Sequence, residues 1–274
     1  MENISISPLI LSDYLYLIVL MMLTALPVGF FAGLFGIGGG LISVPFLFFI
    51  FDYLNFDKSY LMHLSVGTSF SITIMTSLSS LLTHKKNKAF DFKIVINYGI
   101  FVMIGVIAGT FLTAFLDTKF LVLFFSIIVF SFGAYLMLKN ETKQIKTNIT
   151  FFKKLIFGSI SGLICAPMGI TGAMMNVPIF RYFGYPINIA IGFVIALFGA
   201  IGFFISGSFL DADLPLSVGF INIPAFLIFI PITTFMARVG ANTTHRMDKI
   251  KVQRLFGVFL YVIGTIFLLR FLNL

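Results

Sequence analysis

Residues 36–45 of this chain read GIGGGLISVP, and residues 169–178 read GITGAMMNVP. Gly, Ile, Gly, Val and Pro recur in the two stretches at the same spacing, and a further match follows, since Val66-Gly67 is similar to Ile191-Gly192. Glycine weakens a helix because it has no side chain to restrict the backbone. The two stretches therefore predict a helix break at the same point of each of two related halves.

The composition places the whole chain in a membrane. Of its 274 residues, 59% are hydrophobic and only 10% are charged, whereas soluble domains carry about 25% charged residues. Apolar stretches of about 20 residues, the length of helix that crosses a bilayer, recur along the sequence. Alternation with a period of two, typical of an outer-membrane barrel, is absent. We predict an all-α polytopic membrane protein that forms one integral domain in the lipid bilayer of the cell inner membrane.

The apolar pattern predicts a series of helical segments separated by short polar loops. Those at 41–51 and 173–183 are short and directly follow the glycine-rich stretches. Pro224 and Pro231 are expected to kink a later segment. In chain order, the predicted segments are 12–34, 41–51, 60–83, 93–115, 119–139, 153–166, 173–183, 188–208, 217–239 and 254–272.

Basic residues gather in three loops, 84–93, 139–154 and 238–254, and the positive-inside rule places such loops in the cytoplasm. The other ends of the segments are mainly acidic and are expected outside, together with the N-terminus. Their acidic residues are Glu2, Asp13, Asp52, Asp57, Asp117, Asp211 and Asp213. The net charge of +8 is therefore an orientation signal, and we expect no nucleic-acid partner.

The charge pattern and the segment lengths together imply that each glycine-rich stretch is the turn of a hairpin. Residues 12–51 would enter and return at the outer face, and residues 153–183 at the cytoplasmic face. The segment 12–34 is long enough to cross fully, so the first arm is either a tilted full crossing or one arm of a re-entrant hairpin. Each half, residues 1–140 and 141–274, is then a broken or re-entrant helical hairpin plus three transmembrane helices. An odd number of crossings inverts the second half, so we predict two inverted repeats.

Two broken helices at equivalent places in inverted halves are typical of a transporter's substrate site near the midplane. Non-helical backbone at membrane depth is tolerated where it is buried in protein or lines a wet cavity, and the N-terminus of a helix attracts anions. We therefore predict a midplane anion site. Its candidate residues are Gly38, Gly39, Gly40, Gly169, Thr171 and Gly172 through backbone or hydroxyl contacts, and Ser43, His63, Thr68, Ser69 and Asn176 through their side chains.

Each of these residues also has a purely structural interpretation. Glycines permit close packing of membrane helices, and hydroxyls in a helix commonly bond to a carbonyl one turn back. His63 could carry a proton or assist an anion by its charge, or it could simply bond to a loop carbonyl. Ser43 and Asn176 could cap or bridge helices.

The sequence lacks the patterns of an enzyme or a metal protein. It contains no phosphate-binding Lys loop, no metal-ligand spacing and no plausible Ser/His/Asp set, so we expect no catalytic residue, cofactor or metal. No acidic residue lies deep in any predicted segment, which favours an anion over a metal cation as the substrate. The single Cys165 is expected to pack as a small apolar residue.

A set of motifs runs along the chain: GLFGIGGG at 33–40, Val44-Pro45, HLSVGTS at 63–69 and, in the second half, Gly169, Gly172, Val177-Pro178 and Gly184-Tyr185-Pro186. Together, and over nearly the whole chain, these motifs resemble the signature of the TauE/SafE sulfite exporter family. The resemblance implies transport of sulfur-containing anions such as sulfite, sulfonates or sulfoacetate, often as export. Thr171 replaces a glycine of the first-half pattern, and Phe193 stands where the first half has Thr68. These departures argue against a symmetric ligand shell.

The favoured hypothesis is a secondary transporter, an exporter by the resemblance, that works by alternating access around the midplane site. An anion channel and a non-transporting membrane accessory subunit are the alternatives. A coupling proton or cation and a homodimer are left open.

Overall fold

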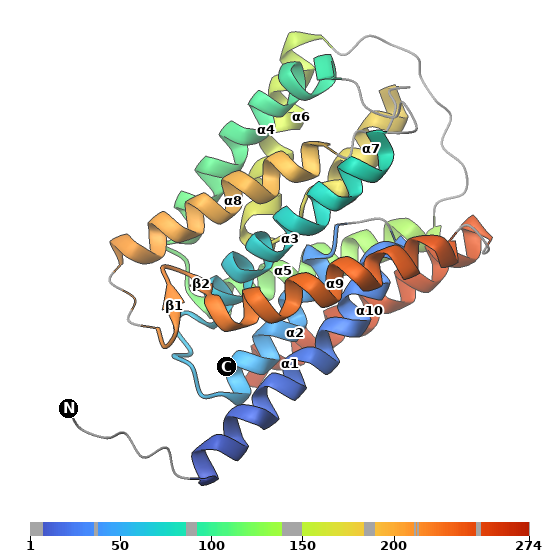
Figure 1. Cartoon of the computed structure of the whole chain (residues 1–274). Helices are drawn as coiled ribbons and strands as arrows, with labels where there is room; N and C mark the ends of the chain where they lie inside the picture. The colour runs from blue at the N-terminus through green and yellow to red at the C-terminus, as the bar shows by residue number, and fades with distance from the viewer. Residues whose placement is uncertain are drawn as a thin grey trace.

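The computed structural model of the chain describes residues 8–35, 38–85, 92–138, 150–183, 190–210, 212, 214–244 and 248–273. Over these residues the chain is almost entirely α-helical (Figure 1). Eight of the described helices are long and apolar enough to cross a membrane. The prediction of an all-α polytopic membrane protein is therefore confirmed.

With one exception, the helices begin and end within five residues of the predicted segments. A short 3₁₀ helix, η1 (Ala166–Met168), leads from α6 into the second glycine-rich stretch. In chain order the α-helices are α1 (Pro8–Phe35), α2 (Gly40–Tyr53), α3 (Leu61–Lys85), α4 (Phe92–Thr113), α5 (Thr118–Leu138), α6 (Phe151–Cys165), α7 (Ala173–Phe183), α8 (Ala190–Phe209), α9 (Ile223–Thr244) and α10 (Lys249–Asn273).

The exception is the predicted segment 217–239, which begins with a β-hairpin instead of a helix. Strand β1 (Ser217–Val218) pairs antiparallel with β2 (Ile221–Asn222). Between them Gly219 has a φ of +56°, and Leu216 just before β1 has a φ of +52°. Both values lie in the left-handed region, which a right-handed helix does not visit. The prediction of a helix from residue 217 is therefore wrong.

The side chain of Asn222 marks the true start of α9. Its Oδ1 accepts a hydrogen bond of 3.0 Å from the N–H of Ala225, which is the usual action of an asparagine at a helix N-terminus. Pro224 consequently lies in the first turn, where no intrahelical hydrogen bond is lost. The predicted kink at Pro224 is wrong for this reason, whereas Pro231 does lie inside the helix.

Helices of the first half pair with helices of the second half in a matched pattern. α1 lies against α9 and α4 against α6, while α3 contacts α8 and α5 contacts α10 (Figure 1). Glycines set the closest approaches, as is usual between membrane helices. A methyl group added at Gly29 would come within 2.6 Å of the Cα of Thr233, and one added at Gly158 within 2.8 Å of the Cβ of Phe101. This matched pairing is the one that two repeats related by a twofold axis would have. The predicted boundary between the repeats, at residues 140 and 141, falls outside the described residues.

Each glycine-rich stretch is the turn of a helical hairpin that returns to the end from which it came. In the first hairpin Tyr16 of α1 lies beside Tyr53 of α2, with ring centroids 6.4 Å apart. In the second, Phe157 of α6 lies beside Phe183 of α7, with centroids 5.9 Å apart. α1 has 28 residues and is about 42 Å long at 1.5 Å per residue. The first arm is therefore long enough to cross a bilayer fully.

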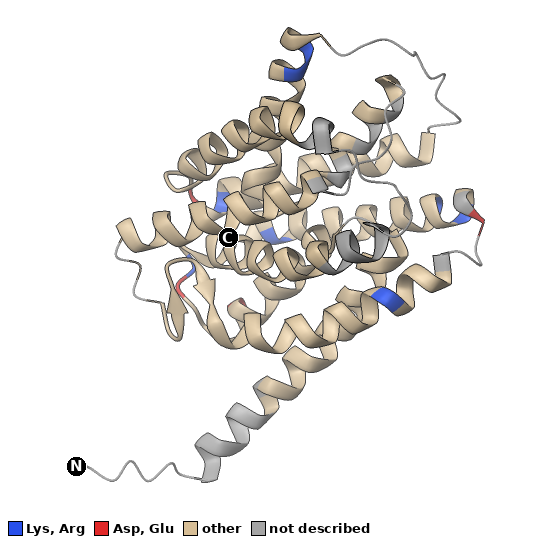
Figure 2. Cartoon of the chain, turned by 45° about the horizontal axis from the view of Figure 1, so that its top comes forward, with Lys and Arg blue, Asp and Glu red and all other residues tan. Residues whose placement is uncertain are grey.

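The two hairpins enter from opposite ends of the molecule. The end that carries β1 and β2, called here the β-hairpin end, also holds the C-terminus of α2, where Asp52 pairs with Arg270 of α10. Charged residues are sparse elsewhere along the helices (Figure 2). Described basic residues at the opposite end are Lys153, Lys154, Arg238, Lys251 and Arg254. Asp211 and Asp213, on which the predicted orientation also rests, lie outside the described residues.

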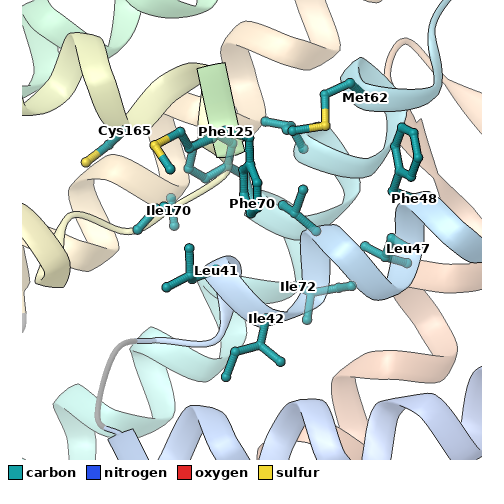
Figure 3. Close-up of a cluster of buried hydrophobic side chains, with 14 of the residues drawn as sticks. Leu41, Ile42, Leu47, Phe48, Met62, Phe70, Ile72, Phe125, Cys165 and Ile170 are labelled. Atoms are coloured by element: carbon teal, nitrogen blue, oxygen red, sulfur yellow. The ribbon is translucent and has the colours of Figure 1, made fainter. Parts of the chain in front are cut away.

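α3 is the central helix of the bundle. Of the candidate spans it is the most buried, with 83% of Leu61–Leu78 inside the protein against 22–44% for the others. Leu41 at the start of α2 lies close to Ile170 of the second glycine-rich stretch, and Phe70 of α3 belongs to the same buried cluster (Figure 3). Gly39 and Gly40 of the first stretch and residues 169–172 of the second are buried, so these parts of the two stretches are packed inside the bundle.

Candidate functional site

Both glycine-rich stretches contain left-handed backbone. In the first, Gly38 has a φ of +78° and Gly39 a φ of +88°; in the second, Gly169 has +66° and Gly172 has +72°. Residues with a Cβ avoid this region, so glycine is required at these points. Thr171, which aligns with Gly38, does not have a positive φ. The replacement of glycine by threonine is thus a real structural difference between the halves. Gly36 and Ile37 lie outside the described residues.

The two glycine-rich stretches touch each other. Gly40 lies against the carbonyl oxygen of Gly169, and Gly38 lies against the side chain of Thr171. In each pair a side chain in place of the glycine would overlap its neighbour. α2 begins at Gly40 and α7 begins at Ala173, so two helix N-termini approach one another here.

Hydroxyls of α3 hold the first stretch in place. Thr76 Oγ1 donates to the carbonyl oxygen of Gly38 at 3.1 Å, and Ser69 Oγ lies 3.3 Å from that of Gly40 and 3.5 Å from that of Gly169. Ser69 also lies at the middle of the candidate span Leu61–Leu78. The meeting point of the two stretches is therefore near the middle of the membrane-spanning helices.

Ser43 belongs to the same cluster. Its Oγ lies 2.6 Å from the Oγ of Ser69 and 3.3 Å from the carbonyl oxygen of Gly40. Both serines are buried, with 1% of Ser43 and none of Ser69 exposed. The structure thus brings Ser43, Ser69, Gly40 and Gly169 together. The hydroxyl of Ser69 lies between the two glycine-rich stretches and contacts both.

A second polar cluster forms around Asn176 of α7. Its Oδ1 accepts hydrogen bonds from the hydroxyls of Tyr98 in α4 and Ser161 in α6, each at 3.0 Å. The Nδ2 of the same amide is buried and has no hydrogen-bond partner among the described residues. A methyl group added at Gly172 would come within 2.6 Å of this nitrogen. The amide group of Asn176 therefore faces the second glycine-rich stretch.

Sequence reasoning missed Tyr98 and Ser161. Tyr98 lies 78 residues from Asn176 in the chain, within an apolar helix. A tyrosine hydroxyl buried in such a helix needs a hydrogen-bond partner, and this was the available signal. Ser161 is flanked by Gly158 and Gly162, which face α4, and its position on that packed face was the corresponding clue.

Thr68 and His63 lie away from the glycine-rich stretches. Thr68 Oγ1 accepts a hydrogen bond of 2.9 Å from the N–H of Asn222, so this hydroxyl faces the β-hairpin. His63 Nε2 lies 2.9 Å from the carbonyl oxygen of Thr113, and its ring packs 5.0 Å from that of Phe220. His63 precedes Ser69 by six residues, about 9 Å along the helix. The structure therefore places both residues towards the β-hairpin end of α3.

The site offers only neutral groups. Apart from apolar side chains such as Ile195, the described residues around it are glycines, serines, threonines, Tyr98 and Asn176. Among the described His, Cys, Asp and Glu residues no group could hold a metal ion. Two helix N-termini add partial positive charge and N–H donors that have no intrahelical acceptor. Such a site can bind an anion through hydrogen bonds without a fixed charge of its own.

An α-helical membrane bundle in which two broken helices meet N-terminus to N-terminus has the architecture of a membrane transporter. The comparison with known proteins agrees and is more specific. The family described as sulfite exporter TauE/SafE matches residues 21–267. The chain belongs to this family.

Several curated relatives match almost end to end. A probable membrane transporter protein of Haemophilus influenzae is 29% identical over 90% of this chain and 96% of its own length. A probable membrane transporter protein of Methanocaldococcus jannaschii is 26% identical over 94% of this chain and 97% of its own length. One of Bacillus subtilis is 23% identical over 90% of this chain and 95% of its own length. No solved structure matches the chain. The chain is thus a multi-pass membrane transporter of the TauE/SafE type.

Proposed function

We propose that this transporter is a secondary carrier for small oxyanions and organosulfonates, sulfite among them, and that the substrate binds where the two glycine-rich stretches meet. The observation that carries the proposal is the approach of the N-termini of α2 and α7 in the middle of the bundle. Two such termini favour negative charge at their meeting point. The family name supports sulfite and related anions as the class to test first.

The burial of the site favours a carrier that works by alternating access rather than a channel with an open pore. Ser43, Ser69, Thr171 and Asn176 are each exposed by 4% or less, so a substrate held between them is closed off from both ends. Release then requires helices to move. The glycine contacts between α1 and α9 and between α4 and α6 suit each pair to move as a unit, and each pair joins one helix of the first half to one of the second.

For the orientation we propose the inner membrane, with the N-terminus and the β-hairpin end outside. The basic residues at the opposite end support this by the positive-inside rule. Export of the anion to the outside is the proposed direction, because the family name describes exporters.

A ligand panel on the purified protein tests the substrate class. Sulfite, sulfate, methanesulfonate and sulfoacetate are compared with chloride and with choline by the shift of the thermal midpoint. A ligand at 100 times its Kd stabilises the folded protein by about 2.7 kcal/mol, so at least one sulfur oxyanion should raise the midpoint. A rise with choline and with none of the oxyanions would overturn the proposal.

A further inference from the structure

We propose that the side-chain amide of Asn176 is a fixed donor for the bound oxyanion, and that Tyr98 and Ser161 are positioning residues that hold it in place. This inference rests on the proposed function and assigns to one residue of that site, Asn176, the selection of anionic over cationic substrates. Asn176 lies on the first turns of α7, while its two partners lie on α4 and α6.

The orientation of the amide is fixed by hydrogen bonds on one side only. Oδ1 accepts from two hydroxyls at 3.0 Å each, which uses both of its lone pairs. Those hydroxyls come from helices that are themselves packed tightly, since a methyl group at Gly162 would come within 2.7 Å of the backbone nitrogen of Val106. The side chain therefore cannot turn without breaking two hydrogen bonds.

The nitrogen of the same amide makes no hydrogen bond to the described residues. Nδ2 is buried and has no partner among the described residues, although a buried donor without an acceptor destabilises a folded protein. It faces Gly172, which has a positive φ and where an added Cβ would come within 2.6 Å of this nitrogen, so the donor lies directly against the second glycine-rich stretch. An acceptor that arrives with the substrate would satisfy this donor.

The aligned position in the first half offers no equivalent donor. Ser43 aligns with Asn176, but its hydroxyl already contacts Ser69 and the carbonyl oxygen of Gly40. Of this aligned pair, only the member in the second half has an unpaired polar atom. The anion is therefore contacted asymmetrically, with its oxygen atoms directed to α7.

The chemistry of an amide N–H selects for charge. It donates to the oxygens of a sulfite or a sulfonate, and it cannot ligate a metal or ammonium cation. Replacement of the NH₂ group by a carboxylate oxygen would invert this preference at nearly constant shape. The Asn176→Asp variant does so, and it retains an oxygen to accept from Tyr98 and Ser161.

The test compares binding of sulfite and methanesulfonate to the parent protein and to Asn176→Asp, by thermal shift and by uptake into liposomes. A hydrogen bond to a charged group typically accounts for about 10- to 100-fold in affinity, and repulsion adds to this loss. We expect the ligand-induced rise of the midpoint to disappear in Asn176→Asp. Sulfite binding by this variant with the affinity of the parent would overturn the inference and leave the proposed function intact.

Two further variants test the positioning role. Tyr98→Phe and Ser161→Ala each free one side of the amide, so we expect a KM for sulfite several-fold above that of the parent at a similar maximal rate. Ser161→Thr keeps a hydroxyl and should restore the KM. Matched controls are Tyr261→Phe in α10 and Ser126→Ala in α5, whose hydroxyl bonds back to Val122 of its own helix.

The outcomes distinguish failure of the roles assigned to Asn176, Tyr98 and Ser161 from failure of the proposed transport function. A purely structural role for Tyr98 and Ser161 would lower the midpoint of the ligand-free protein and leave the KM unchanged, which would overturn their assignment even if Asn176→Asp did not fold. If the parent protein neither binds nor transports any oxyanion, the proposed function fails, and the inference fails with it.

Discussion

At the scale of single residues, left-handed glycines are the strictest requirement of the fold. Gly38, Gly39, Gly169 and Gly172 all have a positive φ, and they allow two chain segments to turn and touch in the middle of the bundle. Their positions could be predicted from the sequence, because glycine runs and matched spacing are visible in it. The replacement of Gly38 by Thr171 in the second half was also visible in the sequence. In the structure Gly38 has a positive φ and Thr171 does not, so the second half does not need a glycine there.

A change at Gly39 should measure this requirement. Gly39→Ala places a Cβ on a residue with a φ of +88° and 3.2 Å from the Cβ of Ala32. A left-handed residue with a side chain costs about 1–2 kcal/mol, so the thermal midpoint in detergent should fall. The control is Gly133→Ala in α5, whose new Cβ would make ordinary contacts of 3.4 Å. A Gly39→Ala protein as stable as this control would contradict the account.

The side chains around the glycines were harder to predict. Ser69 and Thr68 are neighbours, and successive residues of a helix point about 100° apart. Only the packed structure shows that Ser69 faces the glycine-rich stretches while Thr68 faces Asn222 of the β-hairpin. Tyr98 was missed because its partner Asn176 is distant in the sequence.

At the scale of elements, the β-hairpin is the feature that the apolar pattern concealed. Its few residues are largely apolar and continue directly into α9, so hydropathy alone merges the two. Gly219 and the capping residue Asn222 were the local signals of a turn and a helix start. Phe220 of this hairpin is fully buried against His63 and Phe203, which fixes the hairpin to the ends of α3 and α8.

The bond between Thr68 and Asn222 gives a prediction at this scale. Thr68→Val removes the acceptor of the Asn222 N–H at constant shape, and a buried donor left unpaired costs about 1–3 kcal/mol. We expect a lower midpoint for the ligand-free protein and an unchanged rise on addition of sulfite. Loss of the sulfite-induced rise in Thr68→Val would show instead that the binding site extends to the β-hairpin end.

At the scale of the whole molecule, the two hairpins enter from opposite ends and the basic residues gather at one of them. Fold class and helix positions followed from the sequence, because bilayer thickness limits the length of each apolar segment. The contact between the two glycine-rich stretches could be inferred only from their matched positions. The structure adds the residues through which the stretches touch, Gly40 with Gly169 and Gly38 with Thr171.

The proposed orientation can be measured with single cysteines. In a Cys165→Ala background, Lys58→Cys lies at the β-hairpin end and Lys251→Cys at the opposite end, and both positions are exposed. A membrane-impermeant maleimide should label the first in intact cells and the second only after the membrane is opened. The reverse pattern would contradict the positive-inside assignment and place the N-terminus in the cytoplasm.

The most direct test of the central claim is counterflow of sulfite in proteoliposomes. Labelled sulfite is added outside vesicles that are preloaded with unlabelled sulfite, and its uptake is followed over time and concentration. A carrier with an anion site between the two glycine-rich stretches predicts uptake that saturates and is accelerated by the internal sulfite. Uptake that rises linearly with concentration and does not respond to internal sulfite would contradict it.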